Sequence, residues 1–347
     1  MNKQFFTFYF LLFTFYSAVA DAFQYSSGRF GFRANGYGTV GGISSSGDHE
    51  IHNFRFRGQV NYATMPGWTI GAVYSIDQLA IDQDMIFSDA FIFTESPHGR
   101  AEIGFTNSVA GKMAVGLPDV GHTRINNASL LYNHINHSGG IISNPSISDT
   151  RYDFRVSVVS VPTNPIQVGV SFAPSGDNFN TATDIALRLR QPHGRTMYSV
   201  FAGASVIDRP RDLNTDIFMP NVTADRRMQF ATGAHVQQGS YNFGATLRVI
   251  YDQGMTGVPT DGIQIGGGLS YDFLQHSVSG TYILSAVGVW NNHEIMAMPH
   301  NSYITHTVLL SYRNRISPNI EMSLSAGAVI TDEDNNPFVT ANMHLRF

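Results

Sequence analysis

Val339-Thr340-Ala341-Asn342-Met343-His344-Leu345-Arg346-Phe347, the end of the chain, alternates strictly between apolar and polar side chains. A period of two is typical of a β-strand with one apolar face and one hydrated face. The alternation runs to an aromatic residue at the very end of the sequence, Phe347. The end of a soluble domain commonly frays into water, whereas a strand that meets lipid can place an aromatic ring at the membrane interface. This stretch therefore favours a membrane-spanning strand.

The composition supports the same class of fold. Charged residues make up 14% of the 347 residues and aromatic residues 12%, whereas charged residues average about 25% in soluble proteins. No apolar run of about 18 residues follows the N-terminal segment, so the sequence predicts no spanning helix. Low charge without such a run favours an all-β transmembrane barrel, in which strands cross the bilayer. The net charge of −5 argues against a nucleic-acid partner, and the lack of cysteine excludes a disulfide framework.

The first 22 residues have the pattern of a signal peptide. Lys3 provides the positive charge, Phe5–Tyr16 is apolar, and small residues offer cleavage after Ala20 or Ala22. The alternative, a true spanning helix, needs a longer apolar run. We expect cleavage of residues 1–22, with 23–347 forming one transmembrane β-barrel domain.

Alternating segments recur along the rest of the chain, as in Phe54-Arg55-Phe56-Arg57. Short connections rich in Pro and Gly, such as Pro66-Gly67 and Pro192-His193-Gly194, alternate with longer polar segments near 39–50, 77–84, 107–149, 173–182, 208–225, 252–260, 287–300 and 331–336. Short turns at one rim and long loops at the other are typical of outer-membrane barrels. About sixteen strands are predicted: 28–38, 51–64, 68–76, 85–95, 99–106, 150–161, 165–172, 183–190, 195–207, 226–237, 240–251, 261–272, 276–286, 301–313, 319–330 and 337–347. A barrel of this size encloses an aqueous channel.

Arginine dominates the basic residues of the predicted strands. The only lysines are Lys3 and Lys112, and most arginines fall on the polar face of a strand. Each would cost about 2–4 kcal/mol facing lipid at the bilayer midplane, so these side chains must face water. Most carboxylates fall in or beside the long loops, which suggests an acidic mouth above an arginine-lined bore. The alternative is that the arginines only form cross-strand ion pairs that stiffen the wall, and both roles can hold together. Arg33, Arg55 and Arg57, on adjacent predicted strands, are the strongest candidates for setting the potential inside the channel.

The longest predicted connection, 107–149, is expected to fold into the bore. A loop of this length without clear structure is unusual unless it has a function. It contains Lys112, Asp119 and Arg124. Asp119 would then oppose the wall arginines across a narrowed channel.

The chain resembles the general porins of Gram-negative bacteria. The resemblance rests on Gly28-Arg29-Phe30-Gly31-Phe32, the run from Ser96 to Gly104, Gly116-Leu117-Pro118-Asp119, the leader and Phe347. It implies a sixteen-stranded homotrimer in outer-membrane lipid and lipopolysaccharide, with a constricting third loop and passive diffusion of ions and small hydrophilic solutes. Such constrictions usually carry several carboxylates, whereas Asp119 is nearly alone here and Glu102 contributes from the wall. Weak or anion-leaning selectivity follows. The predicted pore-lining residues are Arg29, Arg33, Arg55, Arg57, Glu102, Lys112, Asp119, Arg124 and Arg346.

Other motifs do not carry a function. Gly36-Tyr37-Gly38-Thr39-Val40-Gly41 matches the dinucleotide fingerprint by letter, but no helix is predicted after it to receive phosphates. His134 and His137 lack a helix or third ligand at a useful spacing for a metal. No catalytic cluster is visible, so we expect neither enzyme activity nor a cofactor. Three function classes stay open: a general diffusion porin, a substrate-specific channel, and a non-channel barrel acting as an adhesin or enzyme.

Overall fold

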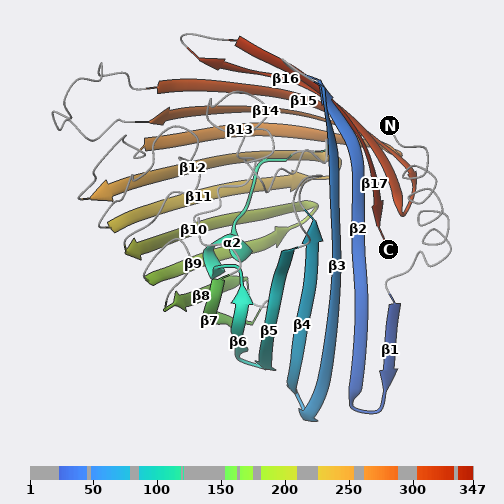
Figure 1. Ribbon diagram of the computed structural model, residues 1–347, viewed down its shortest axis with the longest axis vertical. Coiled ribbons are helices and arrows are strands. Elements are labelled where there is room, and N and C mark those ends of the chain that lie inside the picture. Colours follow the sequence, from blue (N-terminus) through green and yellow to red (C-terminus); the bar gives the residue numbers. More distant parts are fainter. Residues whose placement is uncertain are drawn as a thin grey trace.

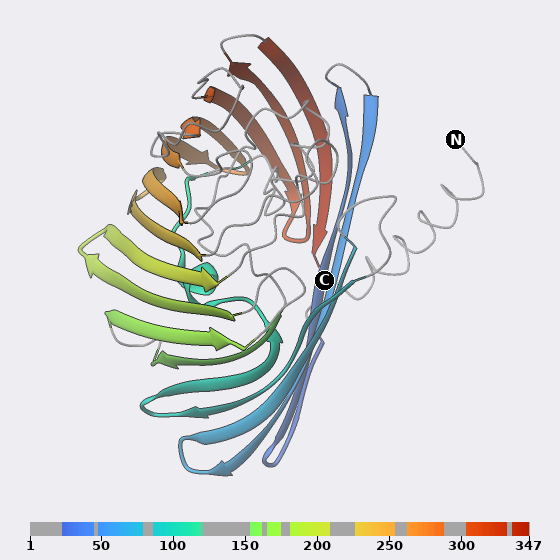
Figure 2. The ribbon, with the colours of Figure 1, turned by 60° about the vertical axis from the view of Figure 1, so that its left-hand side comes forward.

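The computed structural model describes residues 23–44, 48–78, 86–118, 120, 153–161, 165–174, 181–208, 226–253, 262–287, 303–331 and 335–346. Within these ranges sixteen antiparallel strands, β2 to β17, form a closed barrel in which each strand pairs with its neighbours in sequence and β17 pairs with β2 (Figures 1 and 2). The all-β transmembrane barrel fold predicted from the sequence is confirmed. No helix in the described ranges is long and apolar enough to cross a membrane.

The strands have the following bounds: β1 Phe23–Ser27, β2 Phe30–Ser44, β3 Asp48–Met65, β4 Trp68–Gln78, β5 Ile86–Ser96, β6 Gly99–Thr106, β7 Asp153–Ser160, β8 Ile166–Ala173, β9 Thr181–His193, β10 Thr196–Asp208, β11 Arg226–Gln238, β12 Tyr241–Gln253, β13 Gly262–Phe273, β14 His276–Val287, β15 Tyr303–Ser317, β16 Ile320–Thr331 and β17 Asn335–Arg346. A short helix, α2, spans Val109–Met113. All predicted strands after the first lie within four residues of these bounds.

The first predicted strand, 28–38, is wrong at both ends. Gly28, with φ of 60°, and Arg29 form a turn between β1 and β2. Strand β2 then continues to Ser44, so most of the long polar connection predicted at 39–50 is strand. Cross-strand contacts explain the extension, because Thr39 Oγ1 lies 2.8 Å from His344 Nδ1 of β17. Propensity alone misses such a glycine-rich strand, since one of its two partners, β17, lies far away in sequence.

The barrel closes along one edge of β2 that two strands share. β17 pairs with the second half of this edge, from Tyr37 to Ser44. β1 folds back through the turn and pairs with the first half, from Phe30 to Ala34. β1 therefore lies in line with β17 and covers the backbone of β2 that β17 does not reach.

The wall has an apolar outer face and an inner face of polar and small residues. Leu187 is 45% exposed and Leu310 64%, while the inward-facing Ala186 and Leu309 are each 2% exposed. Ser199, Thr246 and Ser323 are among the many buried polar residues of the inner face. A soluble barrel would bury its large apolar side chains, so this distribution fits a wall surrounded by lipid.

The connections differ between the two rims, as predicted. The turns at Gly194 and Gly239, with φ of 60° and 58°, use the left-handed backbone that tight hairpins favour. We call this end, which also carries the turns at 66–67, 97–98, 274–275 and 318–319, the short-turn rim. The opposite end carries most of the longer connections and is called the long-loop rim. Two connections predicted to be long there are wrong, because only residues 45–47 and 332–334 separate the strands at those places. The C-terminal end of β17 lies at the short-turn rim.

Candidate pore constriction

The chain leaves β6 and runs along the inside of the barrel. We call residues 109–118, which begin with α2, the strap. Ser108 caps α2 by accepting a hydrogen bond from the Gly111 backbone N–H at 3.0 Å. The Val109 N–H donates to Ser171 Oγ on β8 at 3.2 Å. Further on, the Val120 N–H donates to Ser279 Oγ on β14 at 3.1 Å. The strap therefore crosses the inner wall from β7 and β8 to β13, with α2 against β7 to β10, and Val120 beyond it reaches β14 (Figure 2).

Apolar packing holds the first half of the strap against the wall. Its contacts are the fully or almost fully buried side chains Val109, Ala110, Met113 and Val115 of the strap and Ala186, Phe201 and Ala231 of strands β9, β10 and β11. Burial of a Val or Met side chain stabilises by about 1.5–3 kcal/mol. This cluster accounts for a strap that lies on the inner wall.

Glycines in the wall make room for the strap. A Cβ at Gly169 of β8 would lie 3.1 Å from Met113 Sδ, and one at Gly244 of β12 would lie 2.6 Å from Pro118 Cδ. A Cβ at Gly233 of β11 would collide with the Val115 carbonyl oxygen. Larger residues at these positions would push the strap towards the centre of the bore.

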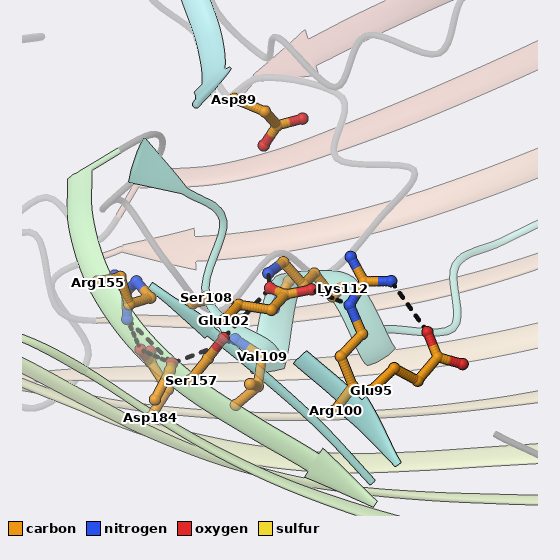
Figure 3. Close-up of polar contacts among 12 residues, drawn as sticks. Asp89, Glu95, Arg100, Glu102, Ser108, Val109, Lys112, Arg155, Ser157 and Asp184 are labelled. Carbon is orange, nitrogen blue, oxygen red and sulfur yellow. Dashed lines mark hydrogen bonds and ion pairs between the residues drawn. The ribbon is translucent and has the colours of Figure 1, made fainter. Parts of the chain in front are cut away.

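Charged groups from β6 and the strap meet at one edge of α2 (Figure 3). Glu102 of β6, 8% exposed, pairs with Lys112 of the strap and accepts hydrogen bonds from Arg100 Nε at 2.8 Å and Ser157 Oγ at 3.3 Å. Arg100 also reaches Glu95, 3.5 Å away, and its guanidinium lies 3.8 Å from the centre of the Phe93 ring. Desolvation lowers the pKa of Lys112, and the charge of Glu102 opposes that shift.

A second charged group lies on β3 and β5. Asp89 of β5, 4% exposed, accepts from Arg55 at 2.8 Å and from Ser75 Oγ at 3.0 Å, with Arg57 at 4.0 Å. The side chains of Arg55 and Arg57 are 24% and 37% exposed. Since these arginines belong to the inward face, their exposed parts lie in the bore.

A third ion pair is buried in the wall near the first turn of α2. Arg155 of β7 pairs with Asp184 of β9, and neither side chain is exposed. Ser171, which accepts from the Val109 N–H, donates to the same carboxylate at 3.0 Å. This pair supports the strap and does not line the bore.

Arg55, Arg57, Glu102 and Lys112 are thus brought to the same side of the barrel. Arg33 lies on β2 opposite Gln59 of β3. Arg29 lies in the turn at the short-turn rim, where it donates to the Thr64 carbonyl at 3.4 Å.

Near the same rim, Arg346 is bound to the buried Glu321 at 3.2 Å, together with Arg315 at 3.1 Å. Asp119 and Arg124 lie outside the described residues. Arg55, Arg57 and Arg346 take part in cross-strand ion pairs, while Arg55 and Arg57 keep exposed parts. That these arginines set the potential of the channel stays a prediction.

Sequence reasoning missed Asp89, Arg100, Phe91 and Phe93 as parts of this site. The run Phe91-Ile92-Phe93 conceals the alternation, because both faces of β5 carry apolar residues there. Phe91 and Phe93 are 5% and 3% exposed and face inward, whereas Ile92 is 59% exposed. Knowledge of the register would have placed Asp89 beside the arginines of β3, since Ser75 pairs with both Asp89 and Arg57. In the described ranges no group of His, Asp or Glu is arranged to hold a metal ion.

Comparison with protein-family models and with curated protein sequences finds no match. Solved structures do match. A loop-deletion variant of OmpT, an outer membrane protein of Vibrio cholerae, has a TM-score of 0.69 at 11% identity, covering 92% of this chain and all of that one. OmpF of Salmonella typhi, in complex with daunomycin, has a TM-score of 0.69 at 9% identity over 94% of this chain and all of that one. The anion-selective porin of Comamonas acidovorans has a TM-score of 0.64 at 9% identity over 92% of this chain and all of that one. With the closed sixteen-stranded wall and the strap inside it, these likenesses confirm the predicted resemblance at the level of architecture: the chain has the fold of the general porins of bacterial outer membranes.

Proposed function

We propose that this protein is an outer-membrane porin, a water-filled channel for passive diffusion of ions and small hydrophilic solutes. The observation that carries the proposal is the strap, which lies against the inner wall of a barrel whose outer face is apolar. A polar, hydrated interior and a lipid-facing exterior are what a barrel of this size needs to conduct. We further propose export by cleavage of residues 1–22, insertion in outer-membrane lipid with lipopolysaccharide, and assembly as a homotrimer.

The charges beside the strap favour a weak preference for anions. Four cationic groups, Arg55, Arg57, Arg100 and Lys112, face three carboxylates, Asp89, Glu95 and Glu102. The two most buried carboxylates, Asp89 and Glu102, are neutralised by close partners, whereas Arg57 is 37% exposed and 4.0 Å from its acid. A positive potential in a narrow aqueous passage raises the local concentration of anions. The Comamonas porin with the same fold is described as anion-selective, which is consistent with this proposal.

Planar-bilayer recording of the refolded protein tests both parts of the proposal. We expect stepwise conductance increases on insertion, and a reversal potential of the sign for anion preference under a salt gradient. Membranes that stay electrically silent despite verified insertion of folded protein would refute the channel. A reversal potential of the opposite sign would be compatible with a conducting channel but would refute the proposed role of the arginines in anion preference.

A further inference from the structure

Two arginines on the inner wall have no acidic partner among the described residues. Arg188 and Arg190 alternate along β9 with the outward-facing Leu187 and Leu189, so both side chains belong to the inner face. The carboxylate of Asp184 on the same strand pairs with Arg155, and Asp208 of β10 pairs with Arg226 at the long-loop rim. This part of the wall therefore carries two positive charges that no carboxylate among the described residues compensates.

The strand register places further donors beside the two guanidinium groups. Arg190 pairs with Ser199 of β10, and Ser199 pairs with His235 of β11. Neighbouring strands are about 5 Å apart and alternate residues of one strand are roughly 7 Å apart. Arg188, Arg190, Ser199 and His235 thus form a patch of a size that one small anion can bridge. We call it the β9–β11 patch.

The patch follows the edge of the strap that faces the short-turn rim. Arg188 comes two residues after Ala186, and His235 comes two residues after Gly233, and both Ala186 and Gly233 contact the strap. The Nε of Arg188 and the Nε2 of His235 are buried and have no hydrogen-bond partner in the part of the chain that the structure describes. A polar atom withdrawn from water without a partner is costly, so a small movement of either side chain that brings this nitrogen to a bound acceptor would relieve an existing penalty.

We propose that the β9–β11 patch is a binding site for a small oxyanion, a phosphate or phosphorylated solute, on the short-turn side of the strap. A pair of guanidinium groups offers planar N–H donors that match phosphate oxygens, which accept several hydrogen bonds at once. The Ser199 hydroxyl and the His235 ring can add donors. Such a site would retain an anion at the exit from the constriction, so that permeation of phosphate saturates with concentration. This inference rests on the proposed channel function, because retention during permeation requires a conducting pore.

The test uses inorganic phosphate and the full-length folded protein in two measurements. Isothermal titration calorimetry in detergent measures binding without a conducting membrane. Planar-bilayer recording in chloride measures block when phosphate is added on either side. We expect saturable binding, and a chloride conductance that falls with phosphate at lower concentrations from the short-turn side than from the other.

Variants assign these effects to the patch. Arg188→Gln and Arg190→Gln should each weaken phosphate binding about tenfold or more, because each removes charged hydrogen bonds. Arg188→Lys should recover only part of the affinity, since an ammonium group lacks the planar fork. Arg195→Gln, in the exposed turn of the same hairpin, removes the same charge outside the bore and should bind phosphate as the parent does.

The outcomes separate this inference from the proposed function. Channels that conduct normally but show neither calorimetric binding nor block by phosphate would refute the site alone. Binding that Arg195→Gln weakens as much as Arg188→Gln would also refute it, because only overall charge would then matter. Phosphate binding by a protein that never conducts would support the site while refuting the channel.

Discussion

Gly244→Ala would test whether the wall glycines set the position of the strap. The added Cβ would lie 2.6 Å from Pro118 Cδ, whereas ordinary contacts begin near 3.4 Å, so the strap must move by about 0.8 Å. The proline ring is part of the backbone and cannot rotate away, and the Gly116 carbonyl, 3.4 Å from the same Cβ, blocks a sideways adjustment. Because the wall lies behind the strap, the movement is directed into the bore. Overpacking of this kind costs about 1–3 kcal/mol.

We expect Gly244→Ala to have a lower single-channel conductance and a lower urea midpoint for unfolding than the parent protein. Gly267→Ala is the matched control, because a Cβ at Gly267 of the next strand meets nothing within 4 Å. Both variants lose a glycine from a strand, so the difference between them in conductance and in urea midpoint reports the contact with the strap alone. An unchanged conductance in Gly244→Ala, or an equal change in Gly267→Ala, would show that the strap does not bound the conducting path.

Three further predictions follow from the charged groups and the terminal residue. Arg55→Glu combined with Arg57→Glu should shift the reversal potential under a salt gradient towards cations, because four charge units change beside the strap; an unshifted potential would mean that these arginines do not set the permeation field. Asp184→Asn should lower the free energy of unfolding by about 3–5 kcal/mol in urea titration, since Arg155 would remain buried without its counter-charge. The control Asp208→Asn, at the half-exposed pair with Arg226, should lower it by no more than about 1 kcal/mol. Similar losses from both variants would contradict the role of burial. Deletion of Phe347 should slow assembly of the barrel in the membrane without changing cleavage of the leader, as followed by pulse-chase labelling, and assembly at the parent rate would refute a role for this residue in insertion.

Much of the barrel could be predicted from the sequence, because membrane strands obey a local rule. Each inward residue meets water or the strap, each outward residue meets lipid, and the backbone imposes a period of two. A segment such as Met228–Val236 is therefore recognised as a strand from its own alternation, without knowledge of the neighbouring strands. The rule fails where one face breaks the pattern. Phe91 and Phe93 face inward on β5, and the glycines of β2 conceal a strand that is held by Asn342 and His344 of β17.

The amino-acid sequence by itself determined the class of fold, about how many strands close the barrel and most of the difference between the rims, since these depend on alternation and turn residues. It did not predict β1. Only the tertiary structure decided which charges compensate each other. Strand register brings Asp89 to Arg55 and Glu321 to Arg315 and Arg346, and the path of the strap brings Lys112 to Glu102. Arg188 and Arg190 meet no carboxylate among the described residues. The physical reason is that electrostatic energy depends on separation in space. A closed barrel brings together residues that are far apart along the chain, so their separation in the sequence does not predict their distance.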